Sequence, residues 1–85
     1  RTRLRLARDA ARLDALLTAN GFEVLGGTSL FRLAAAPDAG RRFEALARRG
    51  VLTRPFPDQP TWLRFGLPKP KDWPRLKAAL EGSRR

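Results

Sequence analysis

The stretch FEVLGGTSLFRLA, residues 22–34, decides the fold of this chain. Two short apolar runs flank GGTS at 26–29, and glycine and small polar residues of this kind favour tight turns. The pattern predicts a hairpin whose strands cover residues 22–26 and 30–34. A hairpin pairs antiparallel strands, so the remaining segments are interpreted outward from an antiparallel sheet.

Helical signals flank the hairpin on both sides. Residues 1–20 repeat apolar side chains at helical spacing and stop at an Asn-Gly pair, where glycine tolerates the left-handed conformation. A second helix is predicted from the Pro-Asp pair at 37–38 to the Arg-Gly pair at 49–50. A third covers 72–82, with an aspartate as N-cap and a proline in its first turn.

Two further strands are predicted after the second helix. They cover residues 51–54 and 62–66, separated by a loop with three prolines that a central strand would not tolerate. The element order is then α-β-β-α-β-β-α, an α/β (α+β) fold with a small antiparallel-rich sheet and helices on one face. The 85 residues are expected to form a single domain, residues 1–85, whose bare sheet face is free to meet a partner.

Strand alternation predicts arginines on that bare face. In the last strand, WLRFG, Leu63 and Phe65 would face the helices and Arg64 would point away from them. The same alternation, applied to the second and third strands, turns Arg32 and Arg54 outward. Arginine binds carboxylate and phosphate through a planar fork of donors. The face is therefore a candidate anion site, although exposed strand arginines are also ordinary, above all at Arg32.

Composition excludes several classes of function. The chain has no His, Cys, Tyr or Met, which removes imidazole and thiolate metal ligands and the common nucleophile–base pairs. Its eight acidic residues form no pair suited to acid–base catalysis, and no apolar run is long enough to span a membrane. No signal peptide is visible, and a start at Arg rather than Met indicates a piece of something longer. No catalytic or metal-binding residue is therefore assigned.

The net charge of +10 raises the question of a nucleic-acid partner. A stripe of four arginines on the first helix is the best candidate feature: Arg1, Arg5, Arg8 and Arg12. No aromatic residues interleave the stripe, and no known nucleic-acid-binding motif accompanies it. A solvated surface in an arginine-rich chain is favoured, so no specific nucleic acid is expected. A non-catalytic basic nucleic-acid-binding module stays an alternative.

Four motifs together resemble a known family. They are GGTSLFRL at 26–33, GVLTRPF at 50–56, WLRFGLP at 62–68 and WPRLKAAL at 73–80. The chain resembles the C-terminal small domain of fold-type I pyridoxal-phosphate enzymes of the histidinol-phosphate aminotransferase type. Within that group it is most similar to the threonine-phosphate decarboxylases of cobalamin biosynthesis. Thr-Ser-Leu stands at 28–30, where histidinol-phosphate aminotransferases often carry an Asn-aromatic pair, and this favours the decarboxylase branch.

The resemblance implies substrate-binding roles for two arginines. In the family, the arginine of the LRxG segment binds the substrate α-carboxylate, and in this chain that residue is Arg64. The arginine that follows the second helix lies by the substrate's phosphate, and here that residue is Arg54. A histidinol-phosphate aminotransferase-like transaminase would use the same carboxylate-binding arginine, so it stays an alternative.

The resemblance also implies what the parent protein is. Pyridoxal phosphate would be held by a large domain absent from this chain, because no segment matches the family's cofactor lysine or phosphate-binding loop. Lys69, Lys71 and Lys77 stand in the wrong context for that lysine. The parent is expected to be a cytoplasmic homodimeric lyase or aminotransferase acting on a phosphorylated amino acid, with no membrane partner. The 85 residues alone are expected to be inactive and to hold no cofactor.

Overall fold

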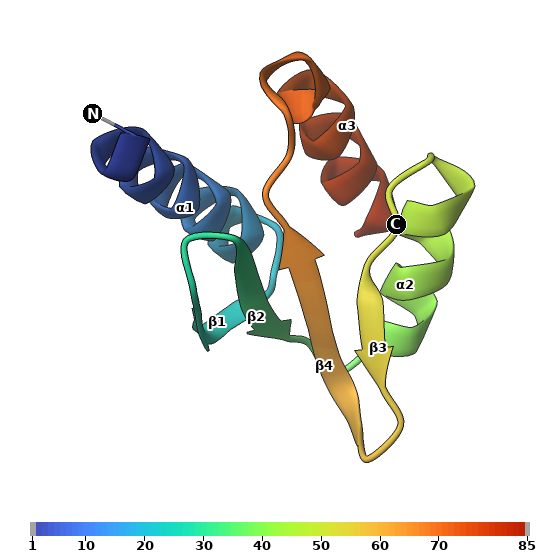
Figure 1. Cartoon of the computed structure of the whole chain (residues 1–85). Helices are drawn as coiled ribbons and strands as arrows, with labels where there is room; N and C mark the ends of the chain where they lie inside the picture. Colours follow the sequence, from blue (N-terminus) through green and yellow to red (C-terminus); the bar gives the residue numbers. More distant parts are fainter. Residues whose placement is uncertain (1, 85) are drawn as a thin grey trace.

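The structure is a computed structural model that describes residues 2–84 (Figure 1). Its elements, in chain order, are α1 (Thr2–Ala19), β1 (Glu23–Gly27), β2 (Phe31–Ala35), α2 (Ala39–Arg48), β3 (Arg54–Phe56), β4 (Gln59–Gly66), a short 3-10 helix η1 (Pro70–Asp72) and α3 (Trp73–Ser83). The order α-β-β-α-β-β-α predicted from the sequence is confirmed, with η1 as the one addition within the described residues.

The four strands form a single antiparallel sheet in the order β1-β2-β4-β3. β1 and β2 are the predicted hairpin, and β4 lies between β2 and the edge strand β3. The third strand begins at Arg54, so the prediction of a strand over 51–54 was wrong in position: residues 51–53 are irregular. Pro55 fits within β3 because an edge strand has one side on which no partner needs its N–H.

The three helices cover one face of the sheet (Figure 1). Leu63 and Phe65 of β4 point into this layer and are almost fully buried, as alternation predicted. They join leucines of all three helices, namely Leu13, Leu17, Leu46, Leu76 and Leu80. Phe22 contacts Phe65 edge to face, with 5.2 Å between the ring centroids. None of the helices in residues 2–84 is both long enough and apolar enough to cross a membrane.

Glycines with positive φ end two helices and tighten the hairpin. Gly21 and Gly50 have φ of +87° and +82°, so both predicted helix stops are confirmed. Gly27 has φ of +139°, and a Cβ there would lie 2.4 Å from the carbonyl oxygen of Phe31. Position 27 therefore accepts glycine alone, and the close turn fixes where β2 begins.

A buried arginine ties the ends of the helices together. The side chain of Arg42 on α2 is 7% exposed. Its Nη1 donates a 2.7 Å hydrogen bond to the carbonyl oxygen of Asn20 at the end of α1, and its Nε lies 3.3 Å from Asp38. The guanidinium also lies over the ring of Phe22, 4.9 Å from the centroid. This network holds α1 and α2 in place beside the sheet.

Candidate functional site

Arg54 and Arg64 are directly opposite each other across the β3–β4 pair. On the other side of β4, Arg64 is opposite Leu33 of β2. Opposite residues in an antiparallel pair share one face of the sheet. Since Leu63 and Phe65 face the helices, both arginines lie on the face that the helices leave open. The predicted orientation of Arg64 and Arg54 is confirmed, while their roles stay predictions.

The two guanidinium groups have no acidic partner in the described part of the chain. The ion pairs among residues 4–84 engage other arginines, namely Arg32, Arg41 and Arg42. Arg64 is half-buried, and Arg54 is exposed. Like charges directly opposite each other in a sheet are destabilising, so the pair favours an anion that neutralises both.

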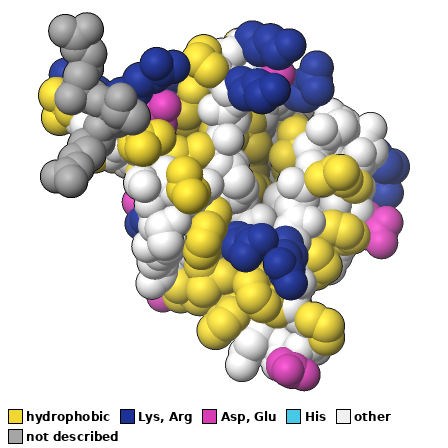
Figure 2. Space-filling view, viewed as in Figure 1, with side chains coloured by type: hydrophobic (Ala, Val, Ile, Leu, Met, Phe, Trp, Pro, Cys, Tyr) yellow, Lys and Arg dark blue, Asp and Glu magenta, His cyan; other side chains and the backbone are white. Residues whose placement is uncertain are grey.

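Apolar side chains frame this arginine pair. The guanidinium of Arg64 lies over the ring of Phe31, 4.9 Å from its centroid. Phe56 of β3 contacts Trp62 of β4 edge to face, with the centroids 5.8 Å apart. Figure 2 shows this arrangement as basic side chains over β3 and β4 with hydrophobic side chains around them. Apolar surroundings displace water, which strengthens hydrogen bonds from a guanidinium to an anion.

Arg32 does not belong to this face, and its prediction was wrong. It is opposite Phe65, which places it on the helix side. There it makes a two-pronged ion pair with Asp14 of α1: Nε lies 2.7 Å from Oδ1, and Nη2 lies 3.1 Å from Oδ2. Phe31 and Leu33 take the open face instead. Alternation predicts the period of β2 but not which side its apolar residues occupy.

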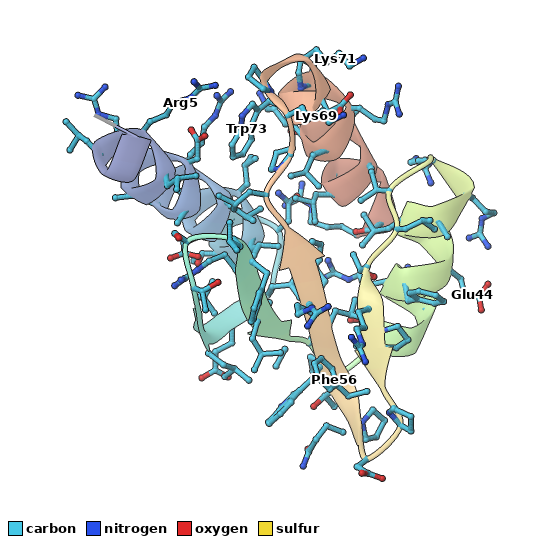
Figure 3. The ribbon with its side chains drawn as sticks, in the orientation of Figure 1. Arg5, Glu44, Phe56, Lys69, Lys71 and Trp73 are labelled. Atoms are coloured by element: carbon cyan, nitrogen blue, oxygen red, sulfur yellow. The ribbon has the colours of Figure 1, made fainter. Side chains whose placement is uncertain are left out.

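The three lysines lie away from the arginine pair. Lys69 directly precedes η1 and Lys71 lies within it, and Figure 3 shows both far from Phe56, beyond the opposite end of the sheet. Lys77 lies on α3, and all three side chains are exposed. The open-face residues of the described strands include no lysine. No amine therefore lies beside the arginine pair to hold a carbonyl cofactor, and the described residues do not fit pyridoxal phosphate.

Three of the four arginines in the predicted basic stripe on α1 lie within the described residues, and their binding to a nucleic acid stays a prediction. Arg5 and Arg8 are exposed, and Arg1 lies outside the described residues. Arg12 is engaged within the chain, because its guanidinium lies over the Trp73 ring at 4.2 Å from the centroid. That contact joins α1 to α3 and is a packing interaction.

Fold and face together define a small α/β domain whose open sheet surface carries paired arginines. No family model matches the chain. It is, however, similar to two curated proteins named threonine-phosphate decarboxylase. The Pseudomonas aeruginosa protein is 44% identical over 79 residues, which covers 92% of this chain and 24% of that protein. The Sinorhizobium sp protein is 47% identical over 57 residues, covering 67% of this chain and 17% of that protein.

These matches confirm the resemblance that the motifs indicated. The chain is similar to the C-terminal region of threonine-phosphate decarboxylases. It spans about a quarter of the length of the Pseudomonas aeruginosa relative (24%) and less of the other.

Proposed function

We propose that this chain is the substrate-recognition small domain of a pyridoxal-phosphate-dependent threonine-phosphate decarboxylase of cobalamin biosynthesis. The observation that carries the proposal is the arginine pair: Arg54 and Arg64 lie opposite each other on the open face, without carboxylate partners among the described residues. The similarity to enzymes named threonine-phosphate decarboxylase supports the choice of reaction. Their named substrate, a phosphorylated amino acid, bears two anionic groups, which matches two cations.

The two arginines are suited to different ends of such a substrate. Arg64 is half-buried and rests on Phe31, so its planar fork matches a planar carboxylate with two parallel hydrogen bonds. Arg54 is exposed and is assigned to the phosphate. A substrate that engages both removes the repulsion between the two cations, which a singly charged amino acid does only in part.

The cofactor belongs to the part of the enzyme outside this chain. Pyridoxal phosphate held there would supply an electron sink for breaking the bond between Cα and the carboxylate. This chain's contribution is to bind and orient the substrate. Two exposed leucines adjoin the strands of the open face: Leu30 precedes β2 and is 70% exposed, and Leu52 precedes β3 and is 80% exposed. They favour packing of the remaining enzyme against this end of the sheet.

The role of Arg64 is tested in the complete enzyme with Arg64→Ala and Arg64→Lys. Each is expected to lower kcat/KM at least about tenfold, equivalent to ~1.4 kcal/mol of transition-state stabilisation. Lysine keeps the charge but lacks the fork, so it should not restore activity. Arg5→Ala, which removes an exposed arginine from α1, is the matched control. Wild-type kinetics in both Arg64 variants would remove the assigned role.

The role of Arg54 is tested with two substrates. Arg54→Ala should raise KM for threonine phosphate far more than for threonine, because only the former carries the phosphate. Equal losses on both substrates would contradict the assignment. Product analysis of the wild-type enzyme completes the test: release of CO2 supports the decarboxylase, and amino transfer without CO2 supports the aminotransferase alternative.

A further inference from the structure

We infer that Phe31 is a positioning residue that holds the guanidinium of Arg64 and thereby sets which anionic end of the substrate each arginine binds. This inference rests on the proposed function, since it assumes that the two arginines bind the two ends of one substrate. It assigns a specificity-determining role to an aromatic side chain that has no polar atom of its own.

The contact between Phe31 and Arg64 follows from the register of the sheet. Phe31 of β2 is opposite Gly66 of β4, two residues beyond Arg64 on the same face. Diagonal neighbours of this kind are within reach of aromatic and long side chains. Gly66 has no side chain to occupy the space opposite Phe31, and the Arg64 guanidinium lies 4.9 Å from the ring centroid.

Phe31 is itself held in place by the hairpin turn. Its carbonyl oxygen accepts a 2.9 Å hydrogen bond from the backbone N–H of Thr28. Gly27 approaches the same carbonyl so closely that no Cβ fits between them. The backbone at Phe31 is thus constrained, which sets the point from which the ring extends toward the Arg64 guanidinium.

The two arginines therefore differ in freedom. The Arg64 guanidinium lies over the Phe31 ring, with 4.9 Å between its central carbon and the ring centroid, and this contact restricts the positions that the guanidinium can take. Arg54 has no aromatic ring under its guanidinium among the described residues. An oriented planar fork favours a planar carboxylate over a tetrahedral phosphate, whereas a mobile guanidinium accommodates either. Phe31 thus directs the carboxylate to Arg64 and leaves the phosphate to Arg54.

The experiment compares two ligands in the complete enzyme. Threonine phosphate carries both anionic groups, and its decarboxylated amino-alcohol phosphate lacks the carboxylate. Phe31→Leu removes the aromatic face but keeps an apolar side chain, so it should weaken binding of threonine phosphate about fivefold, a typical cation–π effect. Inhibition by the decarboxylated ligand should change less than about twofold. Phe31→Tyr keeps the aromatic face and should retain wild-type discrimination between the two ligands.

Phe43→Leu is the matched control. Phe43 is a partly buried phenylalanine of α2 that packs against the core on the other side of the sheet. Its replacement should leave the ratio of the two affinities unchanged. If Phe31→Leu does not fold, phenylalanines with one and three ring fluorines at position 31 keep the shape and weaken the negative ring face. Discrimination should then fall stepwise with fluorination.

The outcomes separate the inference from the proposed function. Equal weakening of both ligands in Phe31→Leu, or no change with fluorination, would overturn the inference, because a structural role affects both ligands alike. If Arg64→Ala also leaves the ratio of the affinities for the two ligands unchanged, both the inference and the proposed function fail. If Arg64→Ala removes the discrimination and Phe31→Leu does not, only the role of Phe31 is rejected.

Discussion

Arginines on the two faces of the sheet have different surroundings. On the helix side, Arg32 and Arg42 are largely buried, and each is paired with a carboxylate, from Asp14 and Asp38 respectively. On the open side, Arg54 and Arg64 are opposite each other, and no described carboxylate lies within ion-pair distance of either. The residue type is the same on both sides, so the difference lies in what each guanidinium contacts.

This contrast separates structural arginines from candidate functional ones. A buried charge must be paired, because an unpaired charge in an apolar interior costs several kcal/mol by typical estimates. An opposed pair of cations on a surface does not stabilise the fold, so another cause must account for it. The chain has 18 basic residues, so the number of arginines alone does not indicate a function. What each guanidinium contacts distinguishes the structural arginines from the candidate functional ones.

The largest expected effect contrasts two aromatic residues on opposite faces. Phe65→Ala should lower the free energy of unfolding by about 3–5 kcal/mol, because it empties a core position. Phe56→Ala on the open face should lower it by less than about 2 kcal/mol, since its ring is only partly buried. Urea unfolding followed by circular dichroism measures both. Similar losses would mean that the open face is as much a core surface as the covered one.

The next contrast is between neighbouring arginines of α2. Arg42→Met should lower the free energy of unfolding by about 1–3 kcal/mol, because it leaves the buried carbonyl of Asn20 without a donor. Arg41→Met removes an exposed arginine and should change stability by no more than about 0.5 kcal/mol. The same urea experiment applies. An equal effect of the two variants would show that the buried network does not stabilise the helix layer.

A double-mutant cycle measures the Arg32–Asp14 ion pair of the helix face, and a single variant on the open face provides the comparison. Arg32→Met and Asp14→Ala should show a coupling energy of about 1 kcal/mol, since their ion pair is two-pronged and partly buried. Arg64→Met removes an open-face arginine without a described carboxylate partner, and it should change stability by no more than about 0.5 kcal/mol in either direction. A coupling energy near zero would mean that the ion pair with Asp14 does not stabilise the fold, so Arg32 would resemble Arg64 in this respect.

A smaller effect of opposite sign is expected on the open face. Arg54→Gln should raise the free energy of unfolding by a few tenths of a kcal/mol, because it removes the repulsion from Arg64. The gain should shrink as salt is added, since salt screens exposed charges. Unfolding at low and high ionic strength measures it. A loss of stability would mean that Arg54 is already compensated by another group.

The smallest effect concerns pH. The hydrogen bond from Arg41 holds the pKa of Asp38 below its usual range, and the positive charge of Arg42 acts in the same direction. A lowered pKa in the folded state stabilises the protein above the unfolded-state pKa, and this is lost as pH falls through the lowered value. In Asp38→Asn, the free energy of unfolding should therefore fall slightly less as the pH is lowered. An unchanged pH profile would contradict this contribution.

The elements and the orientation of the candidate site are predictable from the sequence because strong local signals mark them. Glycine at positions 21 and 50 ends helices where the left-handed conformation is needed. Alternation in β4 is clear because Leu63 and Phe65 are apolar and Arg64 is not. Local signals of this kind are sufficient to assign Arg64 to the open face.

The orientation of β2 could not be predicted, because it depends on a distant partner. Phe31 and Leu33 are apolar, yet they line the open face, and Arg32 turns inward because Asp14 on α1 neutralises it. Sequence alternation does not reveal which charge will find a partner 18 residues away. The start of β3 was misplaced for a similar reason, since Arg54 begins the strand only by pairing with Arg64 of β4.

Both borders of the sheet are unsuited to further strand pairing. At one border, β3 contains Pro55, which has no N–H to offer an added strand. At the other, the pairing of β1 shifts register between Val24 and Gly26. Proteins use such features to prevent their sheets from joining edge to edge. Edge-to-edge joining of two such sheets into a fibril is therefore disfavoured.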